Sequence, residues 1–527
     1  MHLLKTKKDI ENLSELLKSS LQRQNKSIAI GLADRSWDIT YSQLHKSVEI
    51  FVNKLLQKGI YEGDVISIVL DNSIEFVIAF LAITWAKAIA APLNPAYKKE
   101  EFDFYLNDQK CVTIINHYGE KAYSAANESA KNLEIPIWEL KMNYKNISSE
   151  FVNIDILGSK IAEPAKLSSV DPENPALLLH TSGTTSKPKG VILTHKNLVT
   201  SICNIINTYE LSPKDKTVLV MPLFHVHGLM AGLLSTLGSG GSVFIPPEGV
   251  FSASNFWNYM TKCNASWYTA VPTIHQILFL RNKKDYPNNN PPVLRFIRSS
   301  SSSLAPSLLE KLEDVFNAPI LEAYSMTEAA HQMSSNPLPK NGPHKMKSVG
   351  KGQNVEIAIL DNKNHILSIG QIGEICVKGE NITPGYRNNK TANDEAFADG
   401  WFHTGDQGYL DNEDYLYLTG RIKELINRGG EKISPIEIDS VLMSNNKILE
   451  AVSFAAPDDI YGEEVNAAII LNKNEKLTEE ELIEFCLSKL SSFKIPKKFY
   501  FCKDFPHTGS GKVQRRKVAE HFLIDNK

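Results

Sequence analysis

The sequence has few cysteines, and none of them are clustered. Only six occur among 527 residues, and no two of them form a CxxC pair. A zinc site of the common spacing and a disulfide framework are therefore not predicted. Scattered thiols of this kind are typical of a reducing compartment, so we expect a cytoplasmic protein.

Long apolar runs and a large excess of one charge are also missing. No stretch of about 18 apolar residues marks a membrane span. The first 22 residues mix charged groups into their apolar positions, unlike a signal peptide, and the last residues carry no Ser-Lys-Leu peroxisomal signal. The formal net charge of −3 gives no general attraction to nucleic acid. We expect no integral membrane association and no nucleic-acid partner, and the sequence leaves the oligomeric state open.

Segments of strand and helix character alternate through much of the chain. A predicted strand at 64–70 precedes an apolar helix at 76–85, and a strand at 88–93 precedes a helix at 100–106. This alternation is typical of layered α/β folds with a mostly parallel sheet. The stretch 116–171 is polar and weakly patterned, so we predict a peripheral excursion there.

The pattern changes twice in the second half of the chain. Strand signals dominate residues 355–417, which predicts a small β-rich lobe. Beyond Gly420 helices and strands mix again over about one hundred residues, a common domain size. Because 527 residues exceed what one core usually supports, we predict a large multi-lobed α/β domain at 1–420, a boundary at 421–424 and a small α+β domain at 425–527.

The most informative stretch is the loop that follows a predicted buried strand at 176–179. It reads HTSGTTSKPKGV and leads into an apolar-periodic helix at 198–209. Small residues let backbone N–H groups approach phosphate oxygens, hydroxyls donate further hydrogen bonds, and lysines add charge. The loop therefore predicts a polyphosphate site. It is not a Walker A loop, because six residues separate Gly183 from Gly190 and Lys189 precedes the glycine.

Four later segments are weak evidence for a function when each is taken alone. They are YSMTE at 324–328, WFHTGD at 401–406, RGGEKISP at 428–435 and GSGK at 509–512. Each alone is typical of a turn, a helix cap or a solvated lysine. Together with the phosphate loop, and in this order, they closely resemble the motifs of the adenylate-forming superfamily, which includes acyl-CoA synthetases, non-ribosomal adenylation domains and beetle luciferases.

The resemblance implies a reaction in two halves with ATP, Mg²⁺ and CoA. A carboxylate attacks the α-phosphate of ATP and gives an acyl-adenylate and pyrophosphate. The small domain, which the resemblance implies to be mobile, then rotates about a hinge, and the thiol of CoA displaces AMP. The enzyme would act by positioning and electrostatics rather than through a covalent nucleophile.

The roles of individual residues are likewise implied by the resemblance. Lys512 would bridge the carboxylate and the α-phosphate as the principal catalytic residue, Thr327 would meet the α-phosphate, and Glu328 would bind Mg²⁺, for which a carboxylate is a suitable ligand. Lys423 would lie at the hinge. The residues implied to contact ATP or CoA are Thr181, Ser182, Gly183, Thr184, Thr185 and Lys189 at the phosphates, Ser301, Ser302 and Tyr324 at adenine, Asp406 and Arg421 at ribose, and Gly429 and Gly430 at the pantetheine tunnel.

The segments expected around the acid are rich in imidazole and hydroxyl groups. His225 and His227 follow a predicted strand, and His331 lies three residues past Glu328. Imidazole N–H groups that converge on one pocket would suit a small, doubly charged acid. These segments are similar to the oxalyl-CoA synthetase branch, which implies that His227, Ser301 and His331 hold the distal carboxylate of oxalate, with His225 beside them.

Three alternatives stay open at this level. The same chemistry could act on a medium- or long-chain fatty acid, in which case an apolar pocket would exclude the histidines. A stand-alone adenylation domain could load a carrier protein. A nucleotide-binding regulator without catalysis would need replacements at Glu328 or Lys512, and both residues are present.

Overall fold

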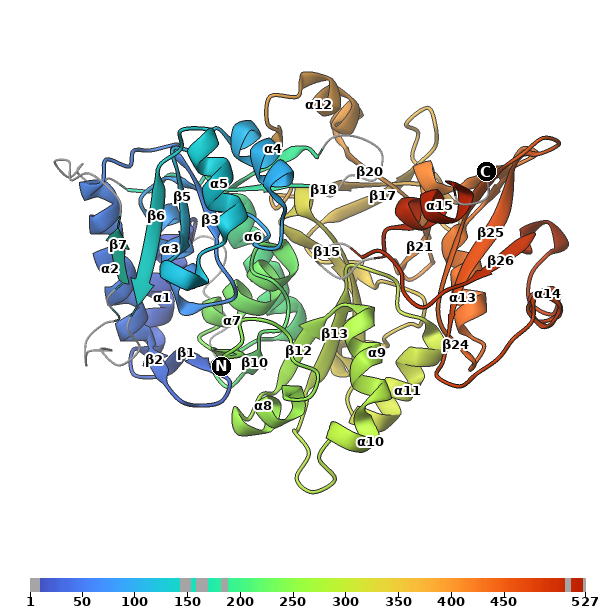
Figure 1. The fold of residues 1–527 in the computed structure, drawn as a ribbon, viewed down its shortest axis with the longest axis horizontal. Coiled ribbons are helices and arrows are strands. Elements are labelled where there is room, and N and C mark those ends of the chain that lie inside the picture. The colour runs from blue at the N-terminus through green and yellow to red at the C-terminus, as the bar shows by residue number, and fades with distance from the viewer. Residues whose placement is uncertain are drawn as a thin grey trace.

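A computed structural model describes residues 10–142, 152, 154–157, 169–181, 188–507 and 513–524. The predicted site residues Ser182, Gly183, Thr184, Thr185 and Lys512 lie outside the described residues. Four sheets organise the chain (Figure 1). Two large sheets and a smaller one belong to the first 421 residues, and the fourth belongs to the C-terminal part.

The largest sheet has nine strands with a parallel centre and antiparallel edges. Parallel pairing runs from β14 through β13, β12, β10 and β11 to β1, while β15, β16 and β2 pair antiparallel. In spatial order its strands are β16 (Lys351–Gly352), β15 (His331–Ser335), β14 (Ile320–Met326), β13 (Phe296–Ser300), β12 (Trp267–Ala270), β10 (Lys216–Val218), β11 (Ser242–Ile245), β1 (Ile28–Leu32) and β2 (Asp38–Thr40).

The second sheet has eight strands and lies on the left of Figure 1 with its blue and cyan helices. In spatial order its strands are β19 (Gly385–Tyr386), β9 (Gly190–Thr194), β8 (Pro175–His180), β4 (Ile89–Pro92), β3 (Val65–Val69), β5 (Thr113–His117), β6 (Ile137–Met142) and β7 (Ile154–Leu157). The predicted peripheral excursion at 116–171 is therefore wrong in part, because β6 and β7 extend this sheet. Their alternating burial, with every second residue turned toward the core, gives strands that are less apolar than the central ones.

A third sheet of four antiparallel strands confirms the predicted β-rich lobe. Its strands are β17 (Glu356–Leu360), β18 (Gly373–Lys378), β20 (Phe402–Leu410) and β21 (Leu416–Arg421). The fourth sheet follows a short 3-10 helix, η7 (Ile422–Glu424). It consists of β23 (Glu431–Ile433), β22 (Ile426–Arg428), β25 (Gly462–Leu471), β24 (Ile448–Asp458) and β26 (Lys498–Phe501).

Side-chain caps begin several of the helices. All twelve residues of α3 are buried, so this helix is apolar on every side, and Ser73 caps it by accepting from the backbone N–H of Phe76. The helices are α1 (Leu13–Gln24), α2 (Tyr41–Gln57), α3 (Ile74–Trp85), α4 (Lys99–Gln109), α5 (Ser124–Asn132), α6 (His195–Tyr209), α7 (Ser235–Gly238), α8 (Phe256–Lys262), α9 (Pro272–Leu280), α10 (Asn282–Asp285), α11 (Pro306–Phe316), α12 (Lys390–Ala396), α13 (Pro435–Met443), α14 (Glu479–Leu487) and α15 (Arg515–Ile524).

The C-terminal part, drawn in orange and red at the right of Figure 1, has its own core and few polar links to the rest. Gln276 on α9 donates to the carbonyl oxygen of Leu449 at 2.5 Å, and Lys311 on α11 donates to Asn446 at 3.0 Å. Arg515 lies 3.4 Å from Glu424. Contacts of this kind are typical of a docked domain rather than a shared core.

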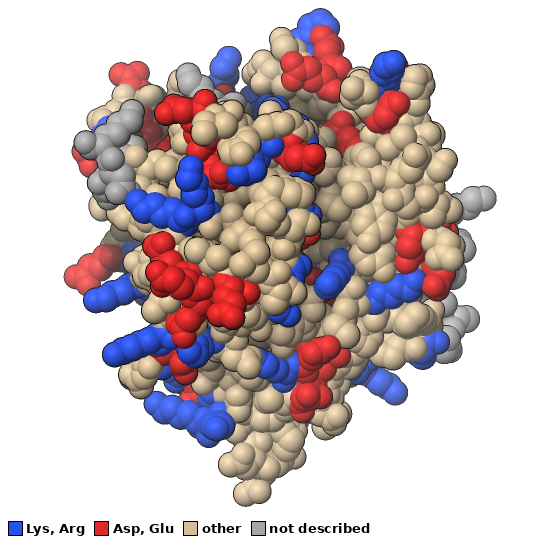
Figure 2. Space-filling model, turned by 90° about the vertical axis from the view of Figure 1, so that its right-hand side faces the viewer, with Lys and Arg blue, Asp and Glu red and all other residues tan. Residues whose placement is uncertain are grey.

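The outer surface and the helices give further constraints. On the face that includes the C-terminal part, acidic and basic side chains are interspersed among uncharged ones (Figure 2). Among the described helices, none combines the length and the apolar character needed to cross a bilayer.

Candidate active site

A cleft of about 400 Å³ brings together residues from all three sheets of the first 421 residues. The predicted site residues that line it are Thr181, Lys189, His225, Ser301, Thr327, Glu328, Arg421 and Lys423. Its walls also include Tyr386, Glu374, His403 and Glu424, which sequence reasoning did not select. Polar groups that converge on one cleft are typical of a catalytic site.

The phosphate loop joins two antiparallel strands rather than a strand and a helix. β8 ends at His180 and β9 begins at Gly190, so the predicted direct passage into a helix is wrong, although α6 follows immediately and Thr194 caps it with Asn197. The loop is closed at its base, where Thr181 N–H donates to the Lys189 carbonyl at 3.0 Å and Lys189 N–H donates to the Thr181 hydroxyl at 3.3 Å. Of the described part of this loop, the Lys189 side chain, rather than a helix N-terminus, is available to an anion.

Glu328 lies at the end of β14, in the short 3-10 helix η4 (Thr327–Ala329), and is only 6% exposed. The hydroxyl of Tyr386 donates to its carboxylate at 2.9 Å. Burial raises the pKa of Glu328, while the bond from Tyr386 and the charges of Arg421 and Lys189 act in the opposite direction. A buried carboxylate at the cleft wall, with oxygen atoms still able to accept, fits a Mg²⁺ ion that also takes phosphate oxygens.

Tyr386 lies between Glu328 and Lys189 and contacts both side chains. It belongs to β19, which pairs with β9 directly after the phosphate loop. Its ring lies 4.6 Å from the ammonium group of Lys189, and its hydroxyl binds Glu328. One aromatic side chain thus separates the lysine from the carboxylate, which keeps both charges available to a ligand.

Tyr324, Asp406 and Arg421 form a second cluster at the cleft. The Tyr324 hydroxyl donates to one oxygen of Asp406 at 2.5 Å, and Arg421 binds the other oxygen at 3.0 Å. Burial and the neighbouring Asp406 raise the pKa of Tyr324 well above its usual range, so this phenol stays protonated. Each carboxylate oxygen has two lone-pair directions, so Asp406 can still accept one further bond on each side.

Glu374, Cys376 and His403 place three candidate metal-ligand atoms within 4.8 Å of one another. His403 already contacts Glu374 at 2.9 Å, and Gly405 N–H donates to the second Glu374 oxygen at 3.0 Å. Burial raises the pKa of the Cys376 thiol to about 12, so it is protonated at neutral pH and a poor ligand. We interpret this cluster as support for the turn that leads to Asp406.

The hinge candidate Lys423 lies in η7, between β21 of the third sheet and β22 of the fourth. Its neighbour Glu424 lines the cleft and contacts Arg515, whose guanidinium also binds the buried Asp439 at 2.8 Å. Arg515 is three residues past Lys512 in the sequence. Arg515 itself therefore links the C-terminal part to a residue of the cleft wall.

The residues predicted to hold the acid lie close together: His225 and Ser301 line the cleft, whereas His227 and His331 are fully buried and do not line it. His227 begins a π-helical segment, η3 (His227–Leu234), and contacts the hydroxyl of Ser301 at 3.0 Å through Nδ1. The ring of His331 stacks on it with centroids 5.1 Å apart. His225 accepts from the backbone N–H of His227 at 3.2 Å. A π-helical turn is frequent at functional sites because it re-aims side chains.

Two residues of this region, Ser301 and His331, have strained backbone conformations. Ser301 and His331 have φ angles of +76° and +99°, in the region that non-glycine residues rarely adopt. Such conformations cost about 1 kcal/mol or more each and persist where neighbours hold them. The hydroxyl of Ser201 donates to the carbonyl of Ala330 at 2.6 Å and secures one of these turns.

Several predicted residues are not brought to the cleft. Ser302 is exposed and does not line it. Gly429 and Gly430 form the exposed turn between β22 and β23, with φ angles of +58° and +98°, away from the cleft walls. A further histidine, His275 on α9, was not among the residues predicted to hold the acid; it is buried beside Tyr268, and burial lowers its pKa to about 4, which is typical of a structural residue.

Arg298 is the main residue of this region that sequence reasoning missed. It lies in the middle of β13, is completely buried and contacts His227. A signal was present, because a charged residue within an apolar strand is unusual and needs partners.

Comparison with known proteins gives consistent results. The profile of the AMP-binding enzyme family matches residues 17–387, and that of the AMP-binding enzyme C-terminal domain matches residues 437–512. The chain is 48% identical over 516 residues to an oxalate–CoA ligase of Arabidopsis thaliana, covering 98% of this chain and 99% of that protein. It is 46% identical over 529 residues to an oxalate–CoA ligase of Saccharomyces cerevisiae, covering 94% and 95%.

Solved structures extend the comparison to the fold. ATP-bound MatB from Rhodopseudomonas palustris matches with a TM-score of 0.86 and 26% identity, covering 98% of this chain and 100% of that chain. The o-succinylbenzoate CoA synthetase MenE from Bacillus subtilis, in complex with ATP and a magnesium ion, matches with a TM-score of 0.82 and 28% identity, covering 96% and 99%. The predicted arrangement of a large N-terminal and a small C-terminal part is confirmed.

Proposed function

The chain belongs to the AMP-binding enzyme family, and we propose that it is an AMP-forming acid–CoA ligase that activates oxalate. The observation that carries the substrate is the cluster of His227, Ser301 and His331, in which Ser301 lines the cleft and the two histidines are buried next to it. Relatives that are 46–48% identical over nearly the whole chain are oxalate–CoA ligases. A fatty acid would need an apolar tunnel where these polar groups lie.

At the nucleotide end, the proposed roles follow from the chemistry of each group. Lys189 and the phosphate loop would bind the β- and γ-phosphates, and Thr327 would donate to the α-phosphate. Asp406 would accept the ribose hydroxyls, with Arg421 beside it. Tyr324 is 7% exposed and would border adenine with one edge of its ring.

Glu328 would hold Mg²⁺, which when bound neutralises charge on the phosphate oxygens. Tyr386 orients that carboxylate, which lines the cleft, by donating to one of its oxygens. Burial of both residues excludes water from this contact and strengthens it.

At the acid end, oxalate would enter with one carboxylate toward the α-phosphate and the other toward the histidines. His227 would hold the Ser301 hydroxyl through Nδ1, that hydroxyl would donate to the distal carboxylate, and the ring of His331 stacks on that of His227. Two carboxylates on adjacent carbons need donors at both ends of a short pocket. A pocket closed by buried histidines also excludes a longer chain.

Lys512 is proposed to complete the first half-reaction, and rotation about Lys423 would bring Gly429 and Gly430 to the CoA thiol in the second. Their separation from the cleft in this structure is consistent with a rotation between the two halves. Family members bind ATP in the fold described here. We further propose a cytoplasmic location, which fits six free cysteines.

The test is pyrophosphate release with ATP, CoA and a panel of acids. Oxalate, malonate, acetate, glyoxylate, octanoate and palmitate would be compared at a fixed concentration of free Mg²⁺, because oxalate itself chelates the ion. We expect kcat/KM for oxalate to exceed that of every other acid by at least a hundredfold. A preference for octanoate or palmitate would refute oxalate and leave the ligase chemistry intact, whereas turnover only with a carrier protein in place of CoA would refute the thiol acceptor.

A further inference from the structure

Arg298 is one of the largest fully buried side chains of the protein, and it carries a charge. It projects from β13 toward α6 and η3, and its exposed fraction is 0%. Its Nε donates to the Tyr209 hydroxyl at 2.9 Å, and its Nη2 donates to the Gln332 side-chain oxygen at 3.0 Å. Its Nη1 donates to Thr269 at 3.2 Å and approaches Nε2 of His227 at 3.4 Å.

These partners satisfy the hydrogen bonds of Arg298 but leave its charge unbalanced. In the part of the chain that the structure describes, no carboxylate lies within ion-pair distance of this guanidinium. Glu322, on the adjacent β14, pairs with Ser299 rather than Arg298 and so faces the opposite side of the sheet. A buried cation without a counter-ion is costly, so a reason outside the folded chain is needed.

The contacts also fix the proton on His227. A guanidinium only donates, so the Thr269 oxygen accepts from Arg298 and its own hydroxyl hydrogen is free to point to His227 Nε2, 2.6 Å away. Nε2 is then an acceptor, and the proton of the neutral ring lies on Nδ1. That nitrogen faces Ser301, which lines the cleft.

We propose that Arg298 is a positioning residue that makes the acid pocket selective for a doubly charged acid. Its fixed charge lies behind His227, keeps that ring neutral, and holds the Nδ1–H donor toward the cleft. A dianion supplies the missing counter-charge, and the attraction scales with the charge of the acid. This inference rests on the proposed use of oxalate.

The test compares two substitutions of Arg298 with a matched change three residues away. R298M keeps much of the length of the side chain and removes the charge, whereas R298K keeps the charge with fewer donors. R295M changes the neighbouring arginine, which pairs with Asp215. For each variant, the KM values of oxalate and ATP, kcat, and the inhibition constant of glyoxylate would be measured. Glyoxylate has the same two-carbon frame with a single carboxylate.

We expect R298M to raise the KM of oxalate at least tenfold. The KM of ATP should stay within twofold and the glyoxylate inhibition constant within threefold, and R298K should recover part of the loss. R295M should lower the melting temperature and leave the oxalate KM unchanged. An R298M enzyme with an unchanged oxalate KM, or with equal increases for oxalate and ATP, would overturn the inference.

A variant that does not fold and a wild-type enzyme that rejects oxalate each need a separate interpretation. If R298M does not fold, R298K and T269V decide, since T269V removes the hydroxyl that links Arg298 to His227. An oxalate KM within twofold of wild type in both would refute the role, and a severalfold increase in both would support it. If the wild-type enzyme rejects oxalate, the proposed function fails, whereas oxalate turnover with unchanged selectivity in R298M refutes the role of Arg298 alone.

Discussion

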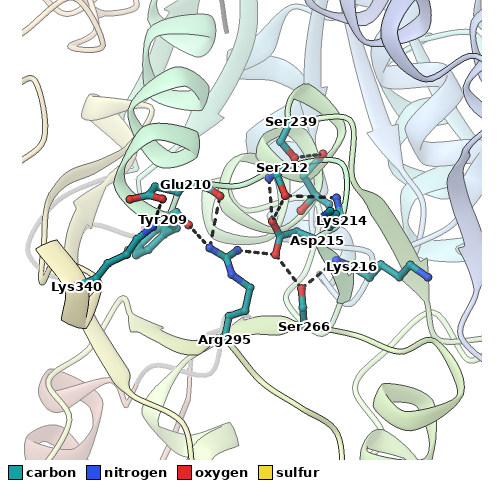
Figure 3. A network of polar contacts seen from close by, with 11 residues as sticks. Tyr209, Glu210, Ser212, Lys214, Asp215, Lys216, Ser239, Ser266, Arg295 and Lys340 are labelled. Carbon is teal, nitrogen blue, oxygen red and sulfur yellow. Dashed lines mark hydrogen bonds and ion pairs between the residues drawn. The ribbon is translucent and has the colours of Figure 1, made fainter. Parts of the chain in front are cut away.

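Two arginines near one strand have opposite relations to the charges around them. Arg295, just before β13, binds Asp215 at 2.5 Å and donates to the carbonyl of Tyr209 at 3.0 Å (Figure 3). Asp215 also accepts from Ser266 and from the backbone and hydroxyl of Ser212. Arg298, on the same strand and bound to the hydroxyl of the same tyrosine, has neutral partners only.

This difference distinguishes charged groups that stabilise the fold by pairing with one another from charged groups that are available to a ligand. In the Asp215 network the buried carboxylate is compensated by Arg295, just as the buried Asp439 is compensated by Arg515. Arg298 behind His227 and Glu328 at the cleft wall are both buried, and their hydrogen-bond partners are hydroxyl, amide and imidazole groups. A buried charge without an opposite charge reduces stability, so its presence at the cleft is best explained by a ligand.

The largest effect is expected at Lys512. K512A should lower the rate of adenylate formation about 10³-fold, because a positive group at the developing acyl-phosphate bond acts mainly on the transition state. The second half-reaction, assayed with a supplied acyl-adenylate and CoA, should be affected less than threefold. K517A, which changes an exposed lysine of α15, is the control. Equal losses in both half-reactions would contradict the proposed division of the reaction.

At Glu328 we expect one substitution to lower activity without lowering stability. E328Q should reduce pyrophosphate release about 100-fold, because the amide cannot replace a charged Mg²⁺ ligand. Burial raises the pKa of Glu328, so its ionised form costs stability at neutral pH, and E328Q should keep or raise the melting temperature. E395Q, at an exposed carboxylate of the same cleft, should change the rate less than twofold. A large loss of stability in E328Q would mean that this carboxylate is structural.

At Arg295 we expect a substitution to lower stability without lowering activity. R295M leaves Asp215 buried without its cation and should reduce the free energy of unfolding by about 2 kcal/mol, a value lowered because the arginine is one-third exposed. The kinetic constants for oxalate and ATP should stay within twofold of wild type. Chemical denaturation with parallel kinetics measures both. A raised oxalate KM in R295M would remove the contrast with Arg298.

The smallest effect is expected at Glu322, whose side chain lies on the face of the sheet opposite Arg298. Burial raises its pKa to about 7, above the ordinary value of a glutamate. The folded state therefore binds this proton more tightly, and the contribution to stability falls as the pH rises from about 4.5 to about 7. E322Q should raise the melting temperature by a few degrees at pH 8 and by little at pH 5. E310Q, on the exposed side of α11, should leave the pH dependence unchanged, and a similar change in both variants would refute the assignment.

The sequence was most informative where function is encoded by neighbouring residues. Spacing and composition of the phosphate loop predicted an anion site, and the segments ending in Glu328 and Asp406 were recognised as motifs because each is continuous in the chain. Apolar periodicity likewise predicted α3 and α6, and strand signals predicted the third sheet. The strand β9 was missed because a five-residue apolar run is too short for periodicity to distinguish a strand from a neighbouring loop or helix.

The sequence alone determined which residue types and motifs this protein has, and so its family chemistry. Only the tertiary structure decided which charges face one another. Tyr386 meets Glu328 across 58 positions, and Arg298 meets His227 across 71. The packing of strands against segments distant in the chain creates both contacts, and local periodicity does not predict it. The unbalanced charge of Arg298 could be recognised only after its neighbours were known, because a charge is paired or unpaired by its surroundings in space.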